Sequence, residues 1–322
     1  MPERNFMNRR TAISALGGGA LAATTARMLL GQDPPPRVTP EVAAGRAKPG
    51  ARPLFCLYSG CLAKIPYAQL PEIVRSMGYD GVDLTVMPGG HVDPSRYMVD
   101  LDRAFQTFQD AGMELPMVTT SFTSPSQPYG YAILYVSGEL GARFCRLGTW
   151  PPSVTGDAGG QLAQMRAMMM RNDLVQFSVT GLRCNITPLL ANHAGSFPGR
   201  SIPEAEALLA GVAPAAFGYC FDPVQAVLEG NSADAWEPAL QAALPRLGAV
   251  ALSDIALDPK PRACPLGEGV IDWKKFFAML AAARFHGPVS MHRDYETHSE
   301  VSAMAKDLAF ARARLEEAWP LS

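Results

Sequence analysis

The sequence predicts a (β/α)8 TIM barrel, an α/β fold in which eight parallel strands, each followed by a helix, close into a ring. Two observations lead to this prediction. Short apolar runs of strand length recur along the chain and end in polar residues. Segments with a helical pattern lie between these runs, and such alternation is typical of a parallel sheet whose strands are buried on both faces. We therefore expect the functional residues at the C-terminal ends of the strands.

The expected strands occupy eight short segments. In chain order they are Leu54–Tyr58, Gly81–Val86, Leu115–Thr120, Phe144–Gly148, a run that ends near Leu190, Phe217–Phe221, Gly248–Leu252 and Val289–Met291. A helical pattern over Leu70–Met77 ends at Gly78, and another begins after Asp272, which we expect to be its N-cap. Helix-to-strand turns are expected at three glycines, Gly112, Gly181 and Gly287. One barrel domain over residues 54–318 follows from this arrangement.

The N-terminal 31 residues have the pattern of a signal peptide. Arginines gather before an uncharged run, Thr11–Ala26, and the segment around Arg9 and Arg10 resembles a twin-arginine export signal. A single membrane anchor is the alternative, but this run is short for a hydrocarbon layer of ~30 Å, so no stable membrane insertion is expected. Residues 32–53 are rich in proline and predict an extended linker. The predicted location is outside the cytoplasm, for example periplasmic.

Composition limits the class of partner. The net charge is −2 and 18% of the residues are charged, so the chain lacks the basic surplus of a nucleic-acid-binding protein. Of the six cysteines, Cys56, Cys145 and Cys220 lie in expected strands, where a small thiol packs well. Cys56 and Cys61 are the one pair close enough in sequence to suggest a disulfide. The three methionines Met168–Met170 are expected to pack within a helix.

Several segments at the expected strand ends carry a family resemblance. They are Gly81–Thr85, Ala191–Gly195, Phe221–Pro223, Leu252–Asp254, Pro265–Trp273 and Gly287–His292. With these segments the chain resembles the sugar phosphate isomerase/epimerase superfamily, the xylose isomerase-like TIM barrels. The resemblance implies a divalent metal (Mn²⁺, Mg²⁺ or Zn²⁺) held by a Glu, an Asp, a His and a second Glu from the ends of strands 5 to 8. It also implies that this metal assists proton transfer between adjacent carbons of a sugar.

Only one of these four family ligands is present. Asp222 matches the strand 6 Asp, but Ala191 stands in place of the strand 5 Glu and Ala251 in place of the strand 7 His. His292 occupies the position of the second Glu, and Gln225 that of a substrate-facing His. The resemblance therefore predicts a degenerate metal site, with Asp222 and His292 as the remaining ligands. A nucleotide cofactor is not expected, because neither a GxGxxG segment nor a P-loop is present.

The candidate site residues all follow expected strands. As catalytic groups we predict Asp222, His292 and His193, and as substrate-binding groups Asn192, His91, Gln225, Asp254 and Trp150. Each also has a simpler interpretation: Asp222 can cap the next helix, His193 can pack in its loop, and Asp254 can orient its neighbours. We expect the side chains after strands 5 to 8 to line one polar pocket.

Three functions fit these observations. The first is an exported isomerase or epimerase-like enzyme acting on a small sugar or sugar derivative. A phosphate on that sugar is not expected, because no basic cluster or glycine-rich anion cradle stands at the predicted site. The second is a non-catalytic carbohydrate-binding barrel, which the missing donors at Ala191 and Ala251 favour. The third is a metal-independent lyase or hydrolase that uses Asp222 and His292.

Overall fold

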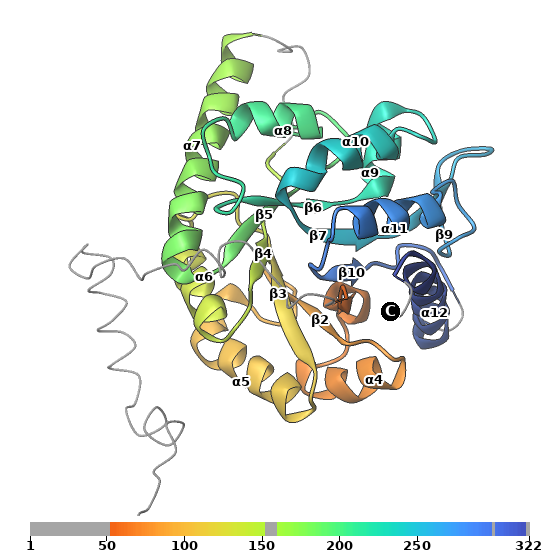
Figure 1. Ribbon diagram of the computed structural model, residues 1–322. Coiled ribbons are helices and arrows are strands. Elements are labelled where there is room, and N and C mark those ends of the chain that lie inside the picture. Colours follow the sequence, from red (N-terminus) through yellow and green to blue (C-terminus); the bar gives the residue numbers. More distant parts are fainter. Residues whose placement is uncertain (1–51, 152–159, 298–299, 320–322) are drawn as a thin grey trace, which may run out of the picture. The chain divides into compact units, whose positions relative to one another are not determined.

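Eight parallel strands close into a barrel with helices around its outside in the computed structural model of this protein (Figure 1). The structure describes residues 52–151, 160–297 and 300–319. All of these belong to one of two units of the chain, Val38–Ser322. The predicted signal peptide, residues 1–31, and the predicted linker as far as residue 51 lie outside the described residues.

The barrel strands follow the predicted segments closely. Their bounds are β1 Phe55–Tyr58, β2 Gly81–Val86, β3 Glu114–Thr120, β4 Phe144–Arg146, β5 Thr187–Ala191, β6 Gly218–Phe221, β7 Leu247–Leu252 and β10 Val289–Met291. Their order around the ring is β1-β10-β7-β6-β5-β4-β3-β2. The first and last strands pair, because Cys56 lies opposite Ser290 on one side and Gly81 on the other. The predicted barrel is confirmed, and its order places β4 directly across the ring from β10.

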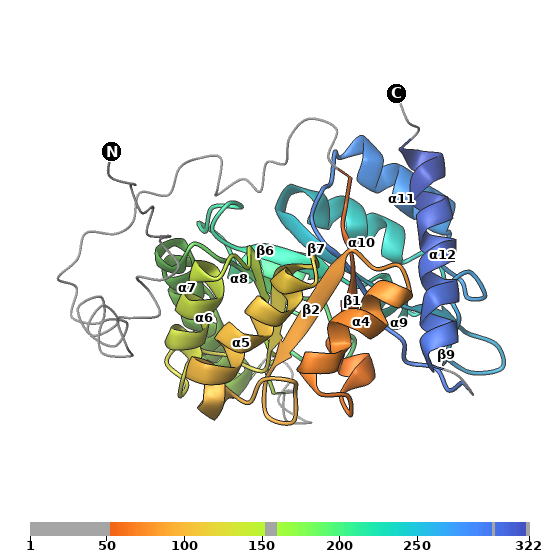
Figure 2. The same cartoon turned by 90° about the horizontal axis from the view of Figure 1, so that it is seen from below.

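Helices connect the strands along the outside of the barrel. Their bounds are α4 Leu70–Ser76, α5 Tyr97–Asp110, α6 Gly130–Glu139, α7 Gln161–Cys184, α8 Ile202–Leu208, α9 Pro223–Gly230, α10 Trp236–Ala243, α11 Trp273–Ala282 and α12 Glu300–Ala318. Short 3-10 turns add η1 Ser59–Leu62, η2 Tyr67–Gln69, η3 Pro94–Arg96 and η4 Leu244–Arg246. In the side view, α12 runs beside α11 (Figure 2). None of the helices in the described part of the chain has the length and apolar character needed to span a membrane.

Local signals explain where two of the helices begin and end. Gly78 follows α4 with φ of +92°, a left-handed backbone that glycine adopts without steric cost. Asp272 precedes α11, and its side chain accepts a hydrogen bond from the Lys275 N–H, as predicted for an N-cap. The helix then packs its aromatic face on the barrel, where Phe276 and Phe277 are fully buried. Burial of each such ring stabilises the fold by roughly 1.5–3 kcal/mol.

The barrel interior is filled by a layer of apolar side chains. Its members are Met117, Phe144, Leu189, Cys220, Ala249 and Ala251. Ala251 belongs to this apolar layer, so the end of β7 contributes a methyl group where the resemblance implies a ligand. Cys56 and Cys61 are both free thiols, so the disulfide suggested by their spacing is not formed.

Two further sequence expectations were wrong in detail, and one element was not predicted. A short antiparallel hairpin, β8 Asp254–Ala256 and β9 Arg262–Cys264, lies between β7 and α11 and was not predicted. Gly181 is not a turn but an interior residue of α7, where a Cβ would lie 2.5 Å from the Pro188 Cδ. Met168 and Met169 are exposed, and only Met170 is buried. The buried face of α7 instead repeats at helical spacing through Met170, Leu174, Phe177, Gly181 and Cys184.

Candidate functional site

A chain of hydrogen bonds joins β2, β3 and β10 at the C-terminal end of the barrel. Asp83 is fully buried, and its two carboxylate oxygens accept hydrogen bonds of 2.7 Å each from Thr119 Oγ1 and Ser290 Oγ. Burial raises the pKa of Asp83 above its usual value, and the two hydroxyl donors oppose this shift. Because both hydroxyl groups donate to Asp83, this carboxylate links the three strands at the base of the C-terminal opening of the barrel, which we call the mouth.

His292 follows β10 directly and stands above Ser290. Its Nε2 lies 3.2 Å from Ser290 Oγ and 3.5 Å from Arg146 Nη1. The ring stacks on Tyr58 from β1, with centroids 4.3 Å apart and planes 7° apart. Burial, and then the charge of Arg146, hold the pKa of His292 well below its usual value. The imidazole is therefore neutral near pH 7 and acts as a hydrogen-bonding group.

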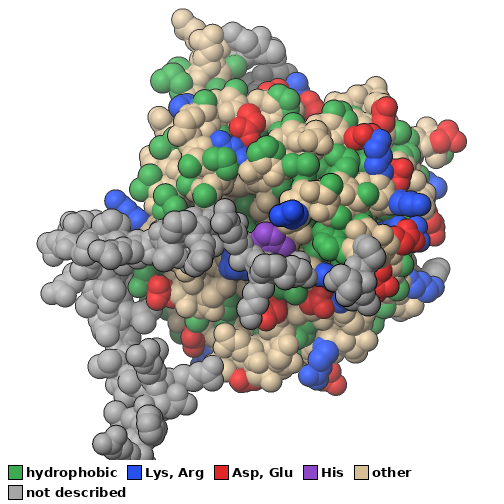
Figure 3. Space-filling model, viewed as in Figure 1, with side chains coloured by type: hydrophobic (Ala, Val, Ile, Leu, Met, Phe, Trp, Pro, Cys, Tyr) green, Lys and Arg blue, Asp and Glu red, His purple; other side chains and the backbone are tan. Residues whose placement is uncertain are grey.

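Arg146 ends β4 and reaches across the mouth of the barrel. Its guanidinium approaches His292, which belongs to the strand on the opposite side of the ring. The negative charges of Asp83 and Asp222 both act on it, although no ion pair within 4 Å joins Arg146 to any carboxylate among the described residues. Near the middle of the face shown in Figure 3, a histidine side chain lies beside basic side chains. Arg146 is the positive centre of the site.

Asp222 directly follows β6, and its two carboxylate oxygens differ in their contacts. Its Oδ1 caps α9 by accepting the N–H groups of Val224 at 2.9 Å and Gln225 at 3.2 Å. Its Oδ2 has no partner in the described part of the chain. Burial raises the pKa of Asp222 to about 6, against the lowering effect of the cap and of Arg146. A half-bonded carboxylate with this pKa can exchange a proton near neutral pH.

The ends of β5 and β6 are tied together through one side chain. Asn192 is buried, and its Nδ2 donates to the Asp222 carbonyl while its Oδ1 accepts from the Asp222 N–H, each at 2.8 Å. The Asn192 amide thus exchanges two hydrogen bonds with the main chain of Asp222, as a further strand residue would do. This pairing fixes the backbone of Asp222.

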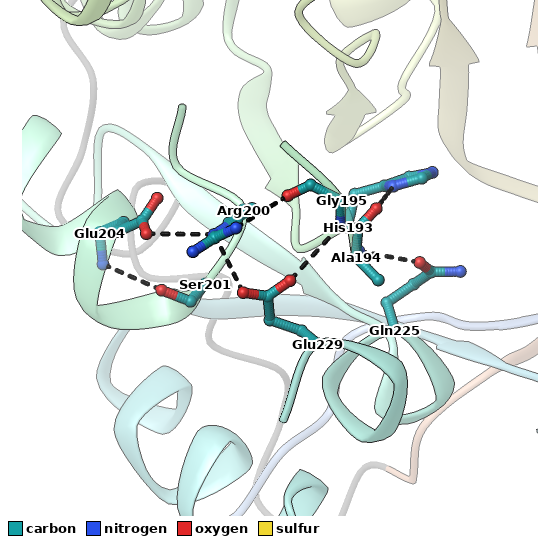
Figure 4. Close-up of polar contacts among 8 residues, drawn as sticks. All are labelled: His193, Ala194, Gly195, Arg200, Ser201, Glu204, Gln225 and Glu229. Carbon is teal, nitrogen blue, oxygen red and sulfur yellow. Dashed lines mark hydrogen bonds and ion pairs between the residues drawn. The ribbon is translucent and has the colours of Figure 1, made fainter. Parts of the chain in front are cut away.

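His193 and Gln225 hold the loop that follows β5. His193 Nδ1 lies 2.7 Å from the Ala194 carbonyl, and its ring packs edge-on against Phe197. Gln225 Oε1 accepts from the Ala194 N–H at 3.0 Å, and Figure 4 shows its amide nitrogen turned away from that contact. In the same view, Arg200 lies between Glu204 and Glu229, which it contacts at 3.2 and 2.9 Å. No hydrogen bond or ring contact joins His193 to Asp222 or His292 within the described residues.

Asp254 is a scaffold residue in this structure. It is 2% exposed, and its Oδ2 accepts from the N–H groups of Gly267 and Gly269 and from Trp273 Nε1 at 2.8 Å. Its Oδ1 accepts from the Ile255 N–H. Both oxygens are occupied, so Asp254 fastens the Pro265–Gly269 segment and α11 to the end of β7, and a substrate contact for Asp254 stays a prediction.

His91 and Trp150 were predicted to bind substrate from the ends of β2 and β4. His91 has both ring nitrogens engaged, Nδ1 with Thr85 Oγ1 at 3.0 Å and Nε2 with the carbonyls of Leu62 and Ile65. Its ring therefore joins η1 to β2. Trp150 is largely buried, and its Nε1 has no acceptor among the described residues. A substrate contact for Trp150 stays a prediction.

The donors at this mouth do not fit a divalent cation. Ala191 and Ala251 offer no ligand atom, and Oδ1 of Asp222 is engaged by α9. The guanidinium of Arg146 lies beside His292 Nε2, so a positive charge already stands next to the second expected ligand. Across the described ranges, no three His, Cys, Asp or Glu side chains are grouped closely enough to hold a metal ion.

Sequence reasoning missed Arg146, Tyr58 and Asp294. Desolvation raises the pKa of Asp294, two residues beyond His292, and the charge of Arg146 opposes this shift. The sequence could have indicated Arg146, because this charged residue directly follows two apolar residues of an expected strand, as Asp222 does. A cavity of about 360 Å³ lies at the other end of the barrel, where Gly218, Gly248 and Gly287 line it.

Known proteins share the fold of this chain. Residues 136–314 match the family of xylose isomerase-like TIM barrels. An L-ribulose 3-epimerase structure is 14% identical, with a TM-score of 0.64 over 83% of this chain and 95% of that chain. A 3-keto-D-glucoside 4-epimerase from E. coli is 14% identical, with a TM-score of 0.63 over 81% of this chain and 100% of the other.

A third structure carries a different chemistry on the same fold. The probable 3-DHS dehydratase from Bacillus anthracis is 14% identical, with a TM-score of 0.58 over 80% of this chain and 98% of that chain. No curated protein sequence matches. The family match covers more than half of the chain, and the barrel order agrees with it. The chain therefore belongs to the xylose isomerase-like TIM barrel family.

Proposed function

We propose that this protein is an isomerase or epimerase-like enzyme that moves a proton on a sugar or sugar derivative without using the family's divalent metal. One observation carries the proposal: Asp222, with a pKa raised by burial to about 6, shares the mouth with the unpaired cation of Arg146. Removal of a proton next to a carbonyl needs a base with a pKa near the working pH and a positive group for the developing oxyanion. Asp222 and Arg146 supply both.

The roles of the other residues follow from their contacts. Neutral His292, fixed by Ser290 and by the Tyr58 ring, can donate or accept a hydrogen bond with a substrate hydroxyl. Asn192 positions Asp222 through its main chain. The epimerase structures that share the fold, including those of D-allulose and D-psicose 3-epimerases, support a sugar as the substrate class.

Deuterium incorporation tests this function directly. The purified protein, treated with a chelator, is incubated in D2O with a panel of ketoses and aldoses, and loss of C–H signals is followed by proton NMR. We expect exchange on at least one sugar, and a fall of roughly 100-fold or more in the Asp222→Asn variant. Glu204→Gln, which alters a surface ion pair, is the matched control and should keep the wild-type rate. Exchange that appears only after a divalent metal is added would contradict the metal-free proposal.

Each of two alternative functions is favoured by one observation. Ala191 and Ala251 favour a carbohydrate-binding barrel without catalysis, which would bind sugars and show no exchange in the same experiment. The dehydratase among the similar structures favours a lyase, which would release a product with a new double bond. The NMR spectra distinguish all three results.

We further propose that the chain is exported by the twin-arginine route, on the basis of Arg9, Arg10 and the uncharged run after them. Replacement of both arginines by Lys should keep the folded protein in the cytoplasm. Fractionation that finds the doubly substituted protein outside the cytoplasm at the wild-type level would contradict this route.

A further inference from the structure

The guanidinium of Arg146 has unused hydrogen-bonding capacity. An arginine carries five N–H donors in a planar fork, and it keeps its charge at every physiological pH. Its one hydrogen-bond contact in the described structure is the 3.5 Å approach of Nη1 to His292 Nε2. By contrast, Arg246, which is also part-buried, donates to Glu206 and to the carbonyls of Phe217 and Val212. Arg146 therefore faces the mouth with most of its donors free.

The carboxylates around Arg146 are held away from it by other partners. Asp83 is bound by Thr119 and Ser290 on its two oxygens. Asp222 is held at the N-terminus of α9 by Val224 and Gln225. For Asp83, Asp222 and Asp294 the pKa is raised by burial even though Arg146 lowers it. No carboxylate of the mouth forms an ion pair with this arginine, as far as the described ranges extend.

We propose that Arg146 binds the carboxylate of a sugar acid, so that the substrate of the site is a uronate or an aldonate rather than a neutral sugar. The fork of a guanidinium matches the two oxygens of a carboxylate, and a charged bidentate contact of this kind is strong when water is largely excluded. The claim that a sugar acid is the substrate of an enzyme rests on the proposed function, whereas the preference for binding a sugar acid can be measured without it.

A phosphate fits this mouth less well than a carboxylate. A sugar phosphate carries close to two negative charges, whereas Arg146 is the one cation without a carboxylate partner that the described residues place near Asp222 and Asp294. The α9 N-terminus cannot supply further donors, because the N–H groups of Val224 and Gln225 already bond to Asp222. A singly charged carboxylate balances Arg146 without a surplus of negative charge.

Calorimetric titration of the purified full chain tests the preference. The probes are D-glucuronate, D-galacturonate and D-gluconate, each beside D-glucose or D-galactose, with D-glucose 6-phosphate and sodium acetate as separate arms. We expect at least one sugar acid to bind about tenfold or more tightly than its neutral sugar, which corresponds to about 1.4 kcal/mol. Acetate should bind far more weakly, because it lacks the sugar hydroxyls, and the phosphate ester should bind more weakly than the acid.

Substitutions locate the effect. Arg146→Gln should remove the preference for the acid, so that the acid and its neutral sugar bind with similar affinity. Arg146→Lys, which keeps the charge and loses the fork, should retain part of the preference and serves as the second variant if the first does not fold. Arg143→Gln is the matched control: it lies three residues earlier, at the other end of β4, is exposed, and should bind as the wild type does.

Four results would overturn the inference. They are equal or tighter binding of the neutral sugar, tighter binding of the phosphate ester, no binding of any sugar acid at roughly 10 mM, and an acid preference that survives in Arg146→Gln. The proposed function fails separately. Acid-selective binding without deuterium exchange would refute the enzyme and support the binding site. Exchange on a neutral sugar, together with no preference for any sugar acid, would support the enzyme and refute the binding site.

Discussion

Asp254 and Asp222 are both enclosed aspartates near the C-terminal ends of neighbouring barrel strands, yet they differ in the number of hydrogen bonds that their carboxylates accept. Asp254 receives four N–H donors and has no oxygen left over. Asp222 receives two donors on one oxygen and leaves the other free. Burial raises the pKa of Asp222 to about 6. The comparison teaches that the number of donors, rather than burial alone, separates a scaffold carboxylate from one that is available for chemistry.

The same contrast holds for two arginines. Arg246, whose side chain is 8% exposed, pairs with Glu206 at 2.9 Å and donates to two carbonyls. Arg146 has a single long contact to His292. We therefore expect substitutions in the bonded region to change stability, and substitutions in the open region to change binding.

The largest expected effect follows from removal of the bonded aspartate. Asp254→Ala leaves the donors of Gly267, Gly269 and Trp273 without an acceptor, and should lower the free energy of unfolding by about 3–4 kcal/mol. Urea unfolding followed by circular dichroism measures this. Asp102→Ala, an exposed position on α5, is the control and should change stability by less than about 0.5 kcal/mol. A loss below about 1 kcal/mol in Asp254→Ala would mean that its hydrogen bonds are dispensable.

Substitution of the two arginines should affect stability differently. Arg246→Gln should lower the free energy of unfolding by about 1–2 kcal/mol, because it breaks the ion pair with the part-exposed Glu206 and removes the hydrogen bonds to the Phe217 and Val212 carbonyls. Arg146→Gln removes an unpaired cation and should leave stability unchanged or raise it by up to about 1 kcal/mol. The same urea titrations measure both variants. If the two lose stability equally, Arg146 is as much a part of the scaffold as Arg246.

A further expected effect depends on pH. The pKa of Asp222 is raised on folding from an ordinary value near 4 to about 6, so the folded chain binds more protons than the unfolded chain between these values. Its contribution to stability is complete below pH ~4 and is lost as the pH rises through ~6. Asp222→Asn keeps a good N-cap without the charge. It should match the wild type at pH ~4 and exceed it at pH ~7.5 by roughly 1–2 kcal/mol, a value reduced because Asp222 is partly exposed. A constant difference at all pH values would refute the raised pKa.

Much of the fold could be predicted because barrel strands are continuous apolar runs. β2 and β10 begin and end where the sequence placed them. The β8–β9 hairpin was missed because its strands have three residues each and flank a polar segment around Pro259 and Lys260, which has the composition of a loop. The exposed Met168 was misjudged from composition, although the spacing of Met170, Leu174 and Phe177 marks the buried face of α7.

The site was harder to predict because its contacts cross the ring. Asp222 and His292 could be placed at strand ends from their motifs, but Arg146 meets His292 across 146 positions of sequence. Only closure of the barrel brings the ends of β4 and β10 together. The sequence also could not show that both carboxylate oxygens of Asp254 are occupied, because three of its hydrogen-bond donors come from a loop and a helix that fold back on it.

The Asn192 amide has a consequence for how this barrel can change. Its two hydrogen bonds to the main chain of Asp222 extend the β5–β6 hydrogen-bond pattern by one residue beyond the end of β5. The rim of the barrel beside Asp222 is therefore held by a side chain and not by the loop backbone. Residues 194–199 are thereby released from supporting that rim. Their length and sequence can vary, and with them the contacts offered to a bound molecule, while the proton-exchanging carboxylate keeps its place.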